Sequence, residues 1–168
     1  SDDTEAVVYG ILEAATCPVI LDADGINVLA GHIDRLDKVS VPVILTPHQG
    51  EFQRIGGDLT KDRITAAREM AEKTGGVIVL KGYRTVVAGP DGRVYVNSTG
   101  NPGMATGGSG DVLSGILTCL VGQGMEPVQA AAAAVWIHGA AGDAAAARLG
   151  IRSMLPTDMI GALSEILM

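Results

Sequence analysis

The chain is organised around the stretch Asn101-Pro-Gly-Met-Ala-Thr-Gly-Gly-Ser-Gly-Asp111, which is followed by the apolar run Val112-Leu-Ser-Gly-Ile-Leu117. Glycine lets a backbone approach a ligand closely and adopt positive φ angles. The apolar run is typical of a helix, whose first N–H groups lack intrahelical partners and carry partial positive charge from the helix dipole. The stretch therefore predicts a site for phosphate or another oxyanion at a helix N-terminus.

Asp111 does not suit a plain anion site, because a carboxylate repels phosphate. The residue is explained if it takes a proton from a hydroxyl group that attacks phosphorus. The alternative is an ordinary glycine-rich turn in which Asp111 is a first-turn residue favoured by the helix dipole. A lone glycine-rich loop is weak evidence for function, so the local pattern leaves both interpretations open.

Length and composition predict one globular domain with a substantial core. The chain has 168 residues, of which 47% are hydrophobic and 18% charged, and this balance excludes a disordered chain. Its net charge of −7 argues against nucleic-acid binding. Cys17 and Cys119 lack metal-binding spacing, which indicates reduced thiols in a cytoplasmic protein. The apolar stretch 130–137 is far shorter than the ~18 residues of a membrane span, so no membrane association is expected.

Helical and strand patterns alternate along the first half of the chain. Helices are expected over 3–15 (with Thr4 as its cap), 26–30 and 62–74, buried strands over 18–21, 41–45 and 77–80, a β-hairpin over 85–96, and further helices over 110–121, 127–149 and 156–167. This alternation predicts a mainly parallel sheet covered by helices. The chain starts on a helix where the pattern calls for an earlier strand, so we expect it to be the C-terminal part of a larger protein.

Polar side chains follow each of the three expected buried strands. Asp22 and Asp24 follow the first strand, His48 and Glu51 the second, and Lys81 the third. Ligands of open α/β sheets bind beyond the carboxyl ends of the strands. We therefore expect these side chains to converge near the glycine-rich stretch.

Each of these residues also has a structural alternative. The two aspartates contact magnesium or substrate, or they serve turns and helix caps. His48 contacts a substrate or caps a helix, and Glu51 binds a metal or is a first-turn acid. Lys81 meets nucleotide phosphates or is a solvated lysine. His138, within an alanine-rich helix, is expected to be structural.

Three motifs together resemble one family. The stretch Asn101–Asp111, with Thr46-Pro-His-Gln-Gly-Glu-Phe52 and Leu21-Asp-Ala-Asp-Gly-Ile-Asn27, is similar to the ADP/ATP-dependent NAD(P)H-hydrate dehydratases of the ribokinase-like superfamily. The resemblance covers nearly the whole chain. It implies an α/β class, a three-layer α/β/α fold with a mainly parallel sheet plus a β-hairpin, in which residues 1–168 form a single dehydratase domain without its N-terminal portion.

The resemblance also implies that the protein is an enzyme, a carbon–oxygen lyase that acts in metabolite repair. The S epimer of hydrated NADH or NADPH accepts a phosphoryl group from ADP (or ATP) on its ring hydroxyl, phosphate is eliminated, and NAD(P)H is restored. Mg²⁺ accompanies the nucleotide, and the family implies a homo-oligomer, a tetramer or larger. The alternatives are a kinase for a small alcohol or vitamin precursor, and a nucleotide-binding fragment without activity.

Site residues follow by motif from the same resemblance. Asp111 corresponds to the catalytic base and also contacts the hydrated nicotinamide. His48 contacts the hydrated dinucleotide, as Asp22 is expected to do from its place at a strand end. The remaining set binds the adenine nucleotide and comprises Lys81, Gly82, Tyr83, Arg84, Thr85, Gly107, Gly108, Ser109 and Gly110. Glu51 is the one candidate for a metal contact.

Overall fold

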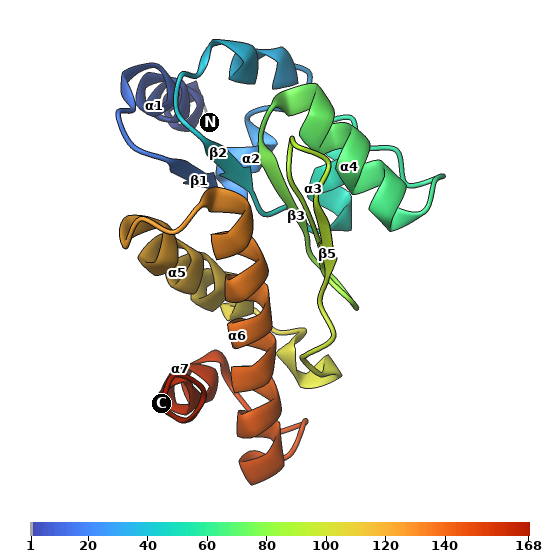
Figure 1. Cartoon of the computed structure of the whole chain (residues 1–168), viewed down its shortest axis with the longest axis vertical. Coiled ribbons are helices and arrows are strands. Elements are labelled where there is room, and N and C mark those ends of the chain that lie inside the picture. Colours follow the sequence, from blue (N-terminus) through green and yellow to red (C-terminus); the bar gives the residue numbers. More distant parts are fainter. Residues whose placement is uncertain (1) are drawn as a thin grey trace. The chain divides into compact units, whose positions relative to one another are not determined.

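A five-stranded sheet forms the centre of the first of two units, Ser1–Val96 and Asn97–Met168, which we describe separately (Figure 1). The computed structural model describes residues 2–168. The sheet has the order β1-β2-β3-β4-β5, with bounds β1 (Val19–Leu21), β2 (Val43–Leu45), β3 (Val77–Leu80), β4 (Val86–Ala88) and β5 (Val94–Val96). Strands β1, β2 and β3 pair in parallel. Strands β4 and β5 pair antiparallel as the expected hairpin, and β4 also pairs antiparallel with β3. The sheet is therefore mixed.

The central strands are apolar throughout because both of their faces are covered. Every residue of β2, β3 and β4 is buried, while β1 is partly exposed at one edge of the sheet and β5 at the other. Strands β1 and β2 begin after Pro18 and Pro42, later than the sequence predicted. Proline has no N–H group to donate to a strand neighbour, which explains both late starts.

Helices of the first unit are α1 (Asp2–Ala14), α2 (Asp24–Asn27), the 3-10 helix η1 (Ile33–Lys38), α3 (Gln49–Arg54) and α4 (Arg63–Thr74). Helix α4 packs on β3 and β4, and the Asp62 side chain caps it by accepting hydrogen bonds from the N–H groups of Ile64 and Thr65. The expectation that Thr4 caps the first helix was wrong, because α1 already begins at Asp2. Helix α2 likewise begins before the expected 26–30, at Asp24.

The second unit is helical, as expected. It contains η2 (Pro102–Met104), α5 (Ser109–Gly122), α6 (Pro127–Leu149) and α7 (Pro156–Ile166). Prolines open α6 and α7, where the missing N–H group costs nothing. The alanine-rich α6 packs against both α5 and α7, and its buried alanines and glycines permit this close approach. Figure 1 shows α6 as the long orange helix of this unit.

Two expectations from composition concern the cysteines and the membrane. Cys17 and Cys119 are free and exposed. Among residues 2–168, no helix is both long enough and apolar enough to cross a membrane.

Candidate functional site

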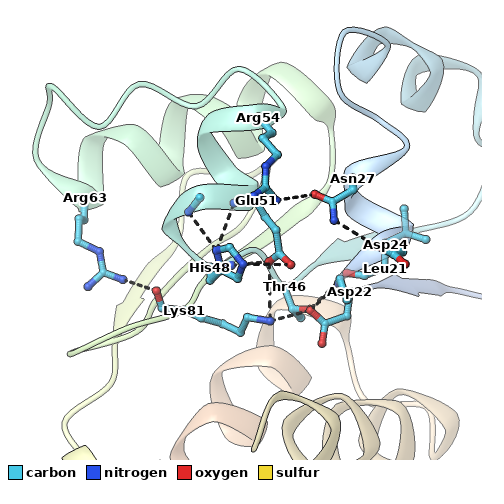
Figure 2. A network of polar contacts seen from close by, with 12 residues as sticks. Leu21, Asp22, Asp24, Asn27, Thr46, His48, Glu51, Arg54, Arg63 and Lys81 are labelled. Atoms are coloured by element: carbon cyan, nitrogen blue, oxygen red, sulfur yellow. Dashed lines mark hydrogen bonds and ion pairs between the residues drawn. The ribbon is translucent and has the colours of Figure 1, made fainter. Parts of the chain in front are cut away.

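Three charged side chains meet at the carboxyl ends of the parallel strands in the first unit (Figure 2). Lys81, after β3, places its Nζ 2.6 Å from Oδ1 of Asp22, after β1, and 4.0 Å from Oε2 of Glu51. The side chains of Lys81 and Asp22 are 20% and 18% exposed, and that of Glu51 only 6%. The expected convergence of strand ends is thus confirmed within this unit. The alternative of a solvated Lys81 is wrong, because the ammonium group is ion-paired and mostly covered.

His48 and Glu51 form a reciprocal cap at the start of α3. His48 Nδ1 accepts hydrogen bonds from the N–H groups of Gly50 and Glu51, at 3.0 and 3.2 Å, and Glu51 Oε2 accepts one from the His48 N–H at 2.8 Å. An Nδ1 that accepts must carry a lone pair, so Nε2 carries the hydrogen and lies 3.4 Å from Glu51 Oε1. The structure therefore shows the capping alternatives for both residues, and the half-exposed His48 ring still offers its outer edge to a ligand.

Asp24 stands apart from that charged cluster. Its Oδ1 accepts a hydrogen bond from Asn27 Nδ2 at 3.3 Å, and Asn27 Oδ1 in turn accepts one from Arg54 Nη1 at 2.8 Å. This chain of contacts ties α2 to the end of α3 (Figure 2). Asp24 is thus an acidic residue in the first turn of α2 and does not cap the helix, whose N-cap is Ala23 without a side-chain hydrogen bond.

Arg63 holds the segment after β3 in place, a role the sequence did not suggest. Its guanidinium group donates to the carbonyl groups of Leu80, Lys81 and Tyr83. Burial lowers the pKa of the Arg63 guanidinium from its ordinary value, and its Nε is buried without a partner among the described residues. One signal in the sequence was the position of Arg63 in the first turn of a helix. A cation there interacts unfavourably with the helix dipole, which suggests that the residue has another role.

The segment that Arg63 holds has an unusual backbone. Gly82 has a φ of 143°, and a Cβ at this position would lie 3.2 Å from Arg63 Nη2. Arg84 has a φ of 53°, which is rare for a residue other than glycine, asparagine or aspartate. The segment 81–85 is therefore a fixed loop whose exposed residues Gly82, Tyr83 and Arg84 face solvent.

In the second unit, the glycine-rich stretch opens α5 as predicted. Gly108 is the N-cap and has a φ of 90°, and a Cβ there would lie 3.3 Å from Pro156 Cγ. The positive φ and the close contact with Pro156 both favour glycine at this position. Ser109 is the buried first residue of α5, and Asp111 lies exposed in its first turn. Helix α5 thus has a carboxylate beside its first N–H groups, of which that of Ser109 donates to the Thr106 carbonyl oxygen at 3.3 Å.

His138, expected to be structural, contacts this turn. Its Nε2 lies 2.9 Å from the Ser109 carbonyl oxygen and 3.3 Å from Ser109 Oγ. Asp143, five residues further along α6, binds Gly100 and Asn101. Neither contact was predicted from the sequence.

A protein-built metal cage is not visible among residues 2–168, where no group of three or more His, Cys, Asp or Glu side chains is arranged to hold an ion. Glu51, the candidate metal contact, uses its carboxylate in the α3 cap and beside Lys81. The proximity of the strand-end residues to the glycine-rich stretch stays a prediction, as do the individual ligand roles.

Comparison with solved structures confirms the class of protein that the sequence predicted, a three-layer α/β fold of the ribokinase-like kind. An ADP/ATP-dependent NAD(P)H-hydrate dehydratase from Bacillus subtilis, co-crystallised with ATP and Mg²⁺, superposes with a TM-score of 0.89 at 37% identity, covering 99% of this chain and 60% of that chain. Phosphofructokinase and ribokinase structures, only 14% to 16% identical, share the fold alone.

The chain belongs to the NAD(P)H-hydrate dehydratase family, whose model matches residues 2–165. It is 45% identical to the bifunctional NAD(P)H-hydrate repair enzyme Nnr of Moorella thermoacetica, over 98% of this chain and 32% of that protein. It is 43% identical to the ADP-dependent (S)-NAD(P)H-hydrate dehydratase of Neisseria meningitidis serogroup B, over 87% of this chain and 52% of that protein. The chain therefore spans between about a third and three fifths of the length of these relatives.

Proposed function

We propose that this protein dehydrates the S epimer of hydrated NADH or NADPH, with ADP or ATP as the phosphoryl donor, and so restores the reduced cofactor. The observation that carries the proposal is the start of α5, where a glycine-rich turn leads directly into a helix with Asp111 in its first turn. Family membership supplies the substrate class, and the name of the Neisseria relative states the donor and the epimer for that protein.

Asp111 acts as the general base in this proposal. The ring hydroxyl of the hydrate attacks the terminal phosphorus of ADP, the bond to the AMP oxygen breaks, and Asp111 accepts the hydroxyl proton. The ring carbon–oxygen bond then breaks, phosphate leaves, and loss of a proton from the adjacent ring carbon restores the double bond. A carboxylate poised beside the attacking oxygen is worth about 10²–10⁴-fold in rate.

The first N–H groups of α5 stabilise the charge that develops on the transferred phosphoryl group. Gly107, Gly108, Ser109 and Gly110 surround that position, and Gly108 and Gly110 keep side chains away from it. Phosphoryl transfer asks the protein mainly for positioning and charge stabilisation. A helix N-terminus with a closely approaching backbone supplies both.

The first unit supplies the remaining ligand contacts in this proposal. The segment Lys81-Gly-Tyr-Arg-Thr85 binds the adenine nucleotide, and its fixed backbone, held by Arg63, supports that role. His48 and Asp22 contact the hydrated dinucleotide. The half-exposed His48 ring supports such a contact, whereas Asp22 binds Lys81 and acts on the substrate beside that lysine.

Mg²⁺ would be held chiefly by the nucleotide phosphates and water, because the described residues offer no set of three protein ligands. When bound, the ion neutralises charge on the phosphates. We further propose a cytoplasmic homo-oligomer, a tetramer or larger.

The test is a coupled assay on the natural protein that contains this sequence. Purified (S)-NADPH hydrate is mixed with ADP and MgCl₂, and the absorbance of reduced cofactor and the release of AMP and phosphate are followed. The proposal predicts recovery of the cofactor only when nucleotide and hydrate are both present, with one phosphate released per cofactor. A stable phosphorylated product without phosphate release would indicate a kinase instead, and nucleotide binding without turnover would indicate a binding module.

A further inference from the structure

One face of α6 lies along the glycine-rich stretch of the second unit. The sequence His138-Gly139-Ala-Ala-Gly142-Asp143 places its histidine, glycines and aspartate at positions i, i+1, i+4 and i+5. Residues four positions apart lie one above the other on a helix, so His138 and Gly142 form one row on α6, and Gly139 and Asp143 form a neighbouring row. Figure 1 shows the yellow segment around η2, which precedes α5, beside the middle of α6.

Asp143 organises the start of the stretch. Its Oδ2 accepts a hydrogen bond from the Gly100 N–H at 2.8 Å, and its Oδ1 accepts one from Asn101 Nδ2 at 3.0 Å. Asn101 Oδ1 in turn accepts from the Gly103 N–H at 3.0 Å, which caps η2. Three donors are thus satisfied in series, and the carboxylate on α6 anchors the series.

The two glycines of the motif allow the stretch to lie directly on α6. A Cβ at Gly139 would collide with Thr99, and a Cβ at Gly142 would collide with Met104. The Thr99 hydroxyl also donates to the Trp136 carbonyl oxygen at 3.0 Å. With contacts this close, the position of α6 determines where the backbone of the stretch can lie.

His138 fixes the other end, at the first turn of α5. A carbonyl oxygen can only accept, so the 2.9 Å contact with the Ser109 carbonyl requires that His138 Nε2 carries the hydrogen. Ser109 Oγ, 3.3 Å from the same Nε2, then faces a donor and can itself only accept there. The Ser109 hydroxyl hydrogen is therefore directed away from His138.

We propose that His138 and Asp143 are positioning residues that set the conformation of the glycine-rich stretch from α6, and thereby the direction of the first N–H groups of α5 and of Asp111. They hold the stretch at Gly100–Asn101, before the residues that approach phosphate, and at Ser109, among those residues. This inference rests on the proposed function, because it assigns the residues that hold that function's machinery in place.

An exchange of amide and carboxylate tests the Asp143 anchor without changing size. In Asp143→Asn, the new NH₂ group faces either the Gly100 N–H or the Asn101 NH₂, and turning Asn101 only moves the conflict to the Gly103 N–H. In Asn101→Asp, two carboxylates face each other. The double variant satisfies every contact again, since residue 143 accepts from Gly100 and donates to residue 101, which still accepts from Gly103.

We expect each single variant to weaken ADP binding and to lower kcat by about tenfold or more, because small misplacement of catalytic groups is costly. The double variant should recover to within about threefold of wild type in both quantities. Glu165→Gln on α7, which removes an exposed ion pair with Arg148, is the matched control and should behave as wild type. Single variants within twofold of wild type, or a double variant no better than the worse single one, would overturn the proposal.

His138 is tested by a second pair. His138→Gln retains an N–H donor near the position of Nε2, whereas His138→Leu does not. We expect the leucine variant to lose kcat at least about tenfold more than the glutamine variant at similar stability to urea. Equal losses of kcat would contradict a positioning role for the Nε2 hydrogen bond.

Hydrogen exchange of the peptide covering 100–109 separates this inference from the proposed function. If the wild-type protein shows no dehydratase activity, the proposed function fails, but the pattern of faster exchange in each single exchange variant and recovery in the double variant still decides the role of Asp143. Unchanged exchange in all variants would refute the anchor regardless of activity.

Discussion

Lys81→Met removes an ammonium group that lies beside two carboxylates. The contacts of this group determine how much unfolding free energy the variant should lose. Lys81 Nζ donates to Asp22 Oδ1 at 2.6 Å, and the two side chains are about one fifth exposed. Glu51 Oε2, nearly buried, lies 4.0 Å from the same nitrogen. A hydrogen bond between charged groups contributes about 1.5–3 kcal/mol, and removing one partner of a buried pair costs about 3–5 kcal/mol. Partial exposure places the expected loss of unfolding free energy at about 2–3 kcal/mol.

Lys61→Met is the matched control, because Lys61 Nζ also lies 2.6 Å from a carboxylate oxygen, that of Glu69, but both side chains are more than 40% exposed. Such surface pairs contribute about 0–1 kcal/mol. Urea unfolding of both variants at pH 7 should therefore separate them by roughly 2 kcal/mol, through a change in midpoint at constant slope. Equal destabilisation of the two variants would refute the reasoning, because it would mean that burial of the Asp22–Lys81 pair does not matter.

Gly110→Val should raise the ADP dissociation constant at least about tenfold, measured by calorimetry, and unchanged affinity would count against close phosphate approach. Lys81→Ala should weaken ADP binding and flatten its salt dependence, because the contact is largely electrostatic; a salt slope equal to wild type would remove Lys81 from the phosphate site. Hydrogen bonds from Thr60 lower the pKa of Asp58. A carboxylate whose pKa is lowered in the folded state stabilises the protein above its unfolded pKa of about 3.9, and this stabilisation is lost as the pH falls through the folded pKa. Asp58→Asn should therefore lose less unfolding free energy than wild type between pH 5 and 2, measured by urea titration. An equal loss in the two proteins would contradict this.

The longest elements were predictable because strong local signals mark their ends. Helix α6 runs from Pro127 to Leu149, as expected, since proline suits its first turn and Gly150 follows it. Strand β3 also matches its expected range, because four consecutive apolar residues, three of them β-branched, suit a strand buried on both faces.

Short elements were predicted only in part, because side-chain contacts decide them. Helix α3 has six residues and begins at a histidine cap, which is not among the usual capping residues. The 3-10 helix Ile33–Lys38 lacks a side-chain cap altogether. No periodic pattern fits into segments of six residues, so local sequence cannot specify them.

The candidate site was predictable only where the topology brings residues together. Asp22, Glu51 and Lys81 follow parallel strands. Because the carboxyl ends of such strands lie at the same edge of a sheet, these side chains were expected to lie close together, as they do. Arg63 and Asp143 escaped because each acts on backbone groups distant in sequence. The contact between Asp143 and the Gly100 N–H spans 43 positions, and nothing in the local sequence of either residue indicates the other.

The central claim is that Asp111, at the start of α5, is the base in dehydration of the NAD(P)H hydrate. Asp111→Asn keeps the size of the side chain and suits a helix start, but it cannot accept the proton. In the natural protein, with folding checked by urea titration, the turnover of (S)-NADPH hydrate should fall by about 10²–10⁴-fold, or roughly 3–5 kcal/mol of activation free energy, while the ADP dissociation constant stays within a few-fold of wild type. Near-normal turnover of a folded Asp111→Asn protein would contradict the assignment and reduce Asp111 to a first-turn residue of α5.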